Sequence, residues 1–145
     1  MGLLLTTLWL LQTSPPEKGE SVLFTTIDKN TTSGFVVPLQ MFLSSQKEWA
    51  EIWATRQGSA TSKRMPPAVD FDRDVVIVAA LGMKNSGGYS LEITRIVRTK
   101  DAIEIFIRST APPDGTKAAV PTSPFVLARM KKPDRMVTFR DEEKK

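Results

Sequence analysis

Hydrophobic and polar positions along the chain follow patterns that predict strands far more often than helices. Residues 75–81 form a continuous apolar run, which is typical of a strand covered on both faces. Residues 102–109 instead alternate, as expected for a half-buried antiparallel strand. Composition and turn residues predict further strands at residues 21–28, 34–39 (an edge strand, because it contains Pro38), 87–97 (with a bulge near Ile96), 125–130 and 136–140. We expect residues 99–101 to turn one hairpin and residues 131–134 to turn a last one.

One segment has helical spacing, at about residues 44–57. Ser45 and Glu48 are spaced as a capping box, and Gly58 stands where a helix commonly ends. Apolar side chains at three- and four-residue intervals, including Trp49 and Trp53, predict a face packed on a sheet. The pattern as a whole predicts an α+β fold. It is a mostly antiparallel sheet or sandwich of six or seven strands with one packed amphipathic helix.

The two ends of the chain differ in composition from its middle. Residues 3–11 are apolar but too few to span a bilayer, so no transmembrane span is expected. No basic residue precedes them, so residues 1–19 fit either a degenerate export signal with a linker or a strand packed on the domain. We expect a single domain over residues 20–140 and a charged tail over residues 141–145. The signal interpretation favours an extracytoplasmic, periplasmic or secreted protein.

Two missing residue types narrow the chemistry. The 145 residues include no cysteine and no histidine. Disulfides, thiol nucleophiles, a histidine general base and histidine- or cysteine-ligated metals are therefore excluded. We expect a protein that is not an enzyme and uses no cofactor or metal.

Two loops are the candidate partner-binding segments. The first, the glycine loop, spans residues 85–89 and carries the single tyrosine of the chain. The second, the proline loop, spans residues 110–124 and contains four prolines. Glycine lets a partner's backbone approach, tyrosine offers a rigid amphipathic contact, and proline reduces the entropy lost on binding. The candidate contact residues are Asn85, Ser86, Gly87, Gly88, Tyr89, Pro112, Pro113, Thr122, Ser123 and Pro124.

Three other motifs are weaker. Asp70, Asp72 and Asp74 resemble the start of a calcium loop, but the glycine and glutamate that complete one are absent. Ser44 and Lys47 have the S-x-x-K spacing of serine acyl-transferases without their accompanying motifs. Finally, a basic cluster suggests a weak nucleic-acid or anionic-surface binder, although no nucleic-acid motif accompanies it. Its members are Arg129, Lys131, Lys132 and Arg135, with Phe106 as a candidate stacking residue.

The order of several motifs carries a family resemblance. An apolar strand ending in glycine (VVIVAALG) is followed by GGYS, LEITRI, IEIFI, a proline-rich loop ending in TSP, and FVLARMKK. This succession resembles the C-terminal domain family of PrcB, the accessory subunit of a bacterial surface protease complex. The resemblance spans roughly residues 75–132, with Trp53 and residues 69–71 as an upstream extension. It implies an extracytoplasmic protein, without catalytic activity, that associates with a protease and stabilises it.

We therefore expect a protein-binding module whose partner is a protein, with a protease as the leading candidate. Three alternatives stay open. A loop-wedge peptidase inhibitor is one, although NSGGY departs from the loop pattern of chagasin-like inhibitors. The weak nucleic-acid or anionic-surface binder is the second, and a histidine-free serine hydrolase based on Ser44 and Lys47 is the third.

Overall fold

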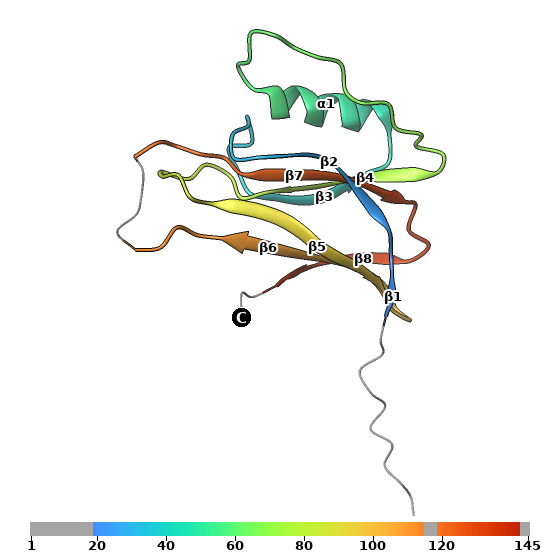
Figure 1. The fold of residues 1–145 in the computed structure, drawn as a ribbon. Helices are drawn as coiled ribbons and strands as arrows, with labels where there is room; N and C mark the ends of the chain where they lie inside the picture. Colours follow the sequence, from blue (N-terminus) through green and yellow to red (C-terminus); the bar gives the residue numbers. More distant parts are fainter. Residues whose placement is uncertain (1–18, 115–118, 143–145) are drawn as a thin grey trace, which may run out of the picture.

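In the part of the chain that the structure describes, the fold consists of eight strands in two stacked sheets and one helix. The computed structural model describes residues 19–114 and 119–142. One sheet has the order β1-β5-β6-β8 and the other β2-β7-β4-β3, and α1 covers the outer face of the second sheet (Figure 1). The elements are β1 (Glu20–Ser21), β2 (Phe24–Asn30), β3 (Leu39–Leu43), α1 (Gln46–Gln57), β4 (Asp74–Ala80), β5 (Ser90–Arg98), β6 (Ala102–Thr110), β7 (Phe125–Lys131) and β8 (Met136–Asp141). Neighbouring strands are antiparallel except β6 and β8, which confirms the predicted fold class.

The hydrophobic core has two layers that share the second sheet. Between the sheets, alternate residues of β4 and β7 pack against the isoleucines of β6 and the inner face of β5. The opposite residues of β4 and β7 pack under α1 around Trp49, which is fully buried. The continuous apolar run of β4 is therefore covered on both faces, and the alternating pattern of β6 has one buried face, as predicted.

Helix α1 begins two residues later than expected and ends as predicted. The Ser45 hydroxyl accepts a hydrogen bond from the Glu48 amide at 3.2 Å and donates one to its carboxylate at 2.9 Å. Gly58 ends the helix with a φ of 56°. The indole N–H of Trp49 donates to the Pro67 carbonyl at 2.9 Å, so the core tryptophan also holds the segment that follows the helix.

The hairpin predictions were correct for β5 and β6 but wrong for β7 and β8. Thr99 donates to Ala102 across the β5–β6 turn, and the register of this pair shifts between Ile93 and Arg95, close to the predicted bulge. After β7, in contrast, the chain leaves the second sheet, and β8 pairs with β6 of the first. A turn-like sequence fixes the bend but not the sheet that the next strand joins.

The first two predicted strands were also placed wrongly in part. The chain passes from the first sheet to the second between β1 and β2, so the segment read as one strand is two. Residues 34–38 lie outside any strand, and the edge strand β3 begins only at Leu39. Gly34 and Phe35 pack closely here, Gly34 against the Thr55 carbonyl and Phe35 against the ring of Phe125. Tertiary packing thus overrides the strand propensity of the FVV sequence.

Candidate functional site

The glycine loop and the proline loop lie together at one end of the sandwich, at the left of Figure 1. Lys84 and Thr122 form an antiparallel bridge, with N···O distances of 2.7 and 2.9 Å. The Thr122 hydroxyl also donates a 2.7 Å hydrogen bond to the Ser86 carbonyl. Two loops that are separated by the whole of β5 and β6 in sequence are therefore joined by three hydrogen bonds.

Gly88 of the glycine loop lies close to Pro112 of the proline loop. Its φ is +88°, in the region that favours glycine, and a Cβ added there would lie 2.6 Å from the Cβ of Pro112. Gly87 beside it does not have a positive φ. Of these two glycines, it is therefore Gly88 whose backbone conformation and close contact require glycine.

Three of the predicted contact residues are buried rather than displayed. Thr122, Ser123 and Pro124 all lie inside the end of the sandwich. The Ser123 hydroxyl donates to the Ser33 carbonyl and accepts from the Ser33 amide, both at 2.7 Å. The TSP sequence thus anchors the proline loop onto the segment after β2.

The other predicted contact residues vary in exposure. Asn85, Gly88 and Pro113 are exposed, whereas Ser86 is buried by the Thr122 contact. Tyr89 is half-buried, and the Lys84 ammonium lies 5.3 Å from its ring centroid. Gly87 and Pro112 are half-buried as well.

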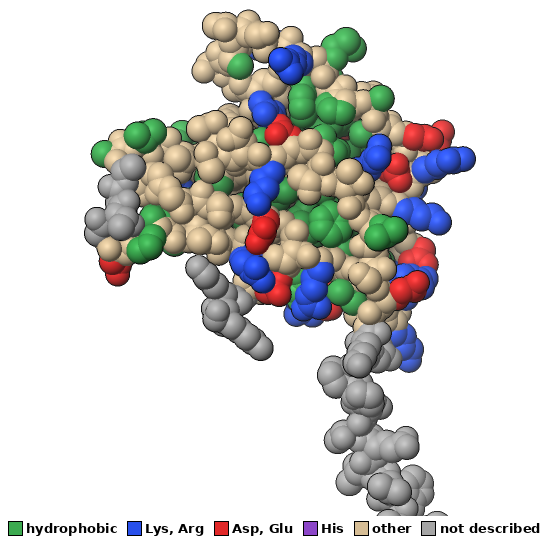
Figure 2. Space-filling model, viewed as in Figure 1, with side chains coloured by type: hydrophobic (Ala, Val, Ile, Leu, Met, Phe, Trp, Pro, Cys, Tyr) green, Lys and Arg blue, Asp and Glu red, His purple; other side chains and the backbone are tan. Residues whose placement is uncertain are grey.

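Sequence reasoning missed the apolar side chains that surround these loops. Val36 and Met83 are exposed and joined by a 3.0 Å backbone hydrogen bond, and Val37 and Val120 expose 60% and 62% of their surface. Figure 2 shows hydrophobic side chains at this end of the molecule. The sequence did offer one sign of them, the two valines directly before Pro38. Proline has no amide hydrogen to donate to a neighbouring strand, so residues next to it tend to lie at the edge of a sheet. We call these four residues, with Asn85, Gly88 and Pro113, the loop-end surface.

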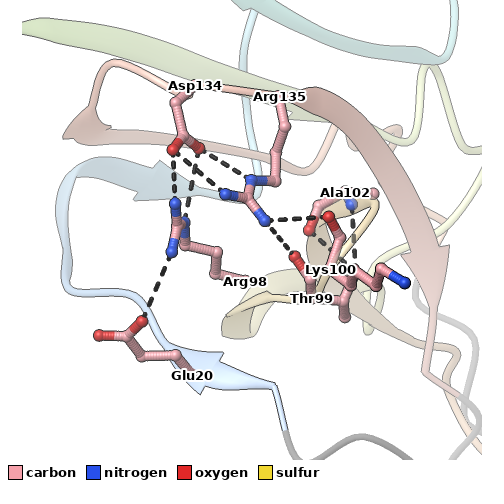
Figure 3. Close-up of polar contacts among 7 residues, drawn as sticks. All are labelled: Glu20, Arg98, Thr99, Lys100, Ala102, Asp134 and Arg135. Carbon is pink, nitrogen blue, oxygen red and sulfur yellow. Dashed lines mark hydrogen bonds and ion pairs between the residues drawn. The ribbon is translucent and has the colours of Figure 1, made fainter.

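Charged side chains gather at the opposite end, where β5 ends and β8 begins (Figure 3). The Asp134 carboxylate accepts hydrogen bonds from Arg98 and from Arg135, and these bonds hold its pKa well below the usual range. The bond to Asp134 in turn raises the pKa of Arg98, which also lies 3.8 Å from a Glu20 carboxylate oxygen. Arg135 donates to the Thr99 carbonyl at 2.6 Å, so this network fixes the β5–β6 turn.

The weaker motifs do not assemble into catalytic or metal-binding geometry. Ser44 and Lys47 are both exposed, and no hydrogen bond joins them. The Asp70 carboxylate accepts from the Asp72 amide, and Asp74 faces Arg129 at 3.8 Å. Among the described residues, no group of three or more metal-ligating side chains converges, and no helix is long and apolar enough to cross a membrane.

Comparison with known proteins gives one match. Residues 75–131 match the family model described as PrcB C-terminal. Searches of curated proteins and of solved structures found no match. The matched segment runs from β4 to the end of β7, so it contains both loops of the loop-end surface. The match over residues 75–131 agrees with the resemblance to this family that the sequence predicted.

Proposed function

We propose that the chain is a binding module without catalytic activity that associates with a protease and stabilises it through the loop-end surface. The observation that carries the proposal is the joining of the two loops at one end of the sandwich, next to four exposed apolar side chains. Exposed apolar residues that gather at one place on a soluble domain mark sites of protein association.

The surface combines rigid and adaptable parts. The bridge between Lys84 and Thr122 fixes the bases of both loops, so little entropy is lost there when a partner binds. The valines and Met83 supply apolar area, and Met83 can adjust its shape to the partner. Asn85, at the exposed tip, offers a polar side chain at the rim.

The protease as partner comes from the family. PrcB C-terminal is named for an accessory component of a protease complex, and the matched segment includes both loops and every residue of the loop-end surface except Val36 and Val37. The location outside the cytoplasm rests on the same resemblance and on the apolar residues 3–11, which lie outside the described part of the chain.

Paired surface variants test this function. V37S/V120S removes two apolar side chains from the loop-end surface, and L23S/M136S removes two from the opposite end, where they expose 91% and 72% of their surface. Each tagged chain is used to capture proteins from extracts of the cells that produce it. The captured fraction is assayed for casein hydrolysis and for the half-life of that activity at 37 °C.

The wild-type chain and L23S/M136S should capture a protease and lengthen its half-life, whereas V37S/V120S should do neither. Because all four side chains are largely exposed, the variants should fold, which circular dichroism verifies beforehand. Capture of the same protease by V37S/V120S, with the same half-life, would refute the loop-end surface as the binding site.

A further inference from the structure

A groove opens between the two sheets at the end opposite the loops. Its volume is about 470 Å³, within the range of small-molecule sites. Ile103 and Met130 are buried at its floor, and Val22 packs against the same core cluster. Leu23 stands at the rim with 91% of its surface exposed. Most of the groove wall is therefore aliphatic.

Some of the charged side chains at the rim of the groove form ion pairs within the part of the chain that the structure describes, and others do not. Both carboxylates, those of Glu20 and Asp134, face Arg98. Lys131 and Lys132 also line the groove and are exposed, and neither forms an ion pair within residues 19–114 and 119–142. The charge left free at the mouth is therefore positive.

Of the four basic residues in the cluster predicted from the sequence, the two arginines already have partners within the chain, which leaves the two lysines. Arg129 faces Asp74 at 3.8 Å, and Arg135 is held by Asp134 and by the Thr99 carbonyl. Phe106, the candidate stacking residue, lies beneath the Arg95 guanidinium at 3.7 Å and is not part of the groove. Because single-stranded nucleic acid requires a basic track interleaved with exposed aromatic rings, this end does not suit it.

We propose that this groove binds one unbranched acyl chain that ends in a carboxylate, taken up as a monomer from solution. The tail lies against Ile103 and Met130, and the carboxylate meets the ammonium groups of Lys131 and Lys132. A site of this kind needs an aliphatic slot and a cationic mouth, and both are present. The groove and the loop-end surface lie at opposite ends of β7, so this proposal does not depend on the proposed function.

A ligand series on the full chain tests the proposal. Hexanoate, octanoate and decanoate are titrated at low salt, and binding is followed by the amide NMR signals of the groove residues. Burial of each methylene should raise the affinity roughly fourfold, so decanoate, with two methylenes more, should bind about fifteenfold more tightly than octanoate. Decanol and decyltrimethylammonium, which carry the same chain with a neutral and a cationic head, should bind progressively more weakly than decanoate.

Two pairs of lysine variants separate the head-group contact from general charge. K131Q/K132Q should weaken decanoate binding by about three- to tenfold. K47Q/K63Q removes the same charge from exposed positions that do not line the groove, and it should leave the affinity unchanged. Raising the salt concentration should weaken binding to the wild-type chain and should have less effect on K131Q/K132Q.

Several results would overturn the proposal. Among them are the absence of saturable decanoate binding, equal binding of the cationic analogue, and an affinity that does not change with chain length. Shifts confined to the loop-end surface would place the ligand elsewhere. Binding of phosphatidylglycerol vesicles without binding of monomeric decanoate would mean that this end contacts a membrane surface instead.

Discussion

Replacement of Gly88 by alanine tests how the two loops are held together. An L-residue with a φ of +88° costs about 1–2 kcal/mol relative to glycine. The new methyl group would also lie 2.6 Å from Pro112 Cβ, in a ring that cannot rotate away, and overpacking of this kind costs about 1–3 kcal/mol. Part of the clash is relieved if the loops separate, so we expect a total loss of about 2–3 kcal/mol in the free energy of unfolding.

Urea denaturation followed by tryptophan fluorescence measures this loss, with G87A as the matched control. Alanine at position 87 does not have to adopt a positive φ, so G87A should leave the stability unchanged or raise it by up to about 1 kcal/mol. With a urea m-value of about 2 kcal/mol/M, G88A should lower the unfolding midpoint by about 1 M or more. Equal midpoints for G88A and G87A would refute the close contact between the loops.

Three further changes test individual contacts. T122V removes the donor to the buried Ser86 carbonyl and should lower the free energy of unfolding by about 1–3 kcal/mol, as measured by thermal unfolding. T122S keeps the hydroxyl and should retain most of this stability. A T122V chain as stable as wild type would argue against the hydrogen bond. S45A should cost about 1 kcal/mol through loss of the N-cap, and unchanged helicity and stability would contradict the capping role. The Asp134 carboxyl has a lowered pKa in the folded chain, so its ion pairs stabilise the fold fully above about pH 3.8, and this stabilisation declines as the pH falls from there toward the lower pKa of the folded state. The stability difference between wild type and D134N, measured by urea unfolding, should therefore shrink between pH 6 and pH 2.5, and a constant difference would contradict the pairing.

Local patterns predicted the elements of this fold well. The apolar run of β4, the alternation of β6, and Ser45 and Gly58 at the ends of α1 each reflect a preference that a few neighbouring residues determine. The candidate loops were also found from local composition, because glycine and proline limit backbone conformation directly.

Features that depend on which distant part of the chain a segment packs against could not be predicted. The bend after β7 looks the same in sequence whether β8 returns to the same sheet or crosses to the other. Thr122, Ser123 and Pro124 appeared in the sequence as loop residues. In the structure, however, Ser123 is buried and forms hydrogen bonds with Ser33, which is ninety positions away. The groove is formed by four stretches of sequence that meet only in the folded chain, so no single stretch predicts it.

Site-specific cross-linking tests the central claim, that the loop-end surface contacts a protease, most directly. Because the chain has no cysteine, V37C and L23C each carry a single photo-cross-linker, at opposite ends of the molecule. After illumination in extracts of the producing cells, mass spectrometry identifies the cross-linked protein. We predict a protease cross-linked from position 37 and not from position 23. A protease cross-linked from position 23 alone, or none from position 37, would contradict the account.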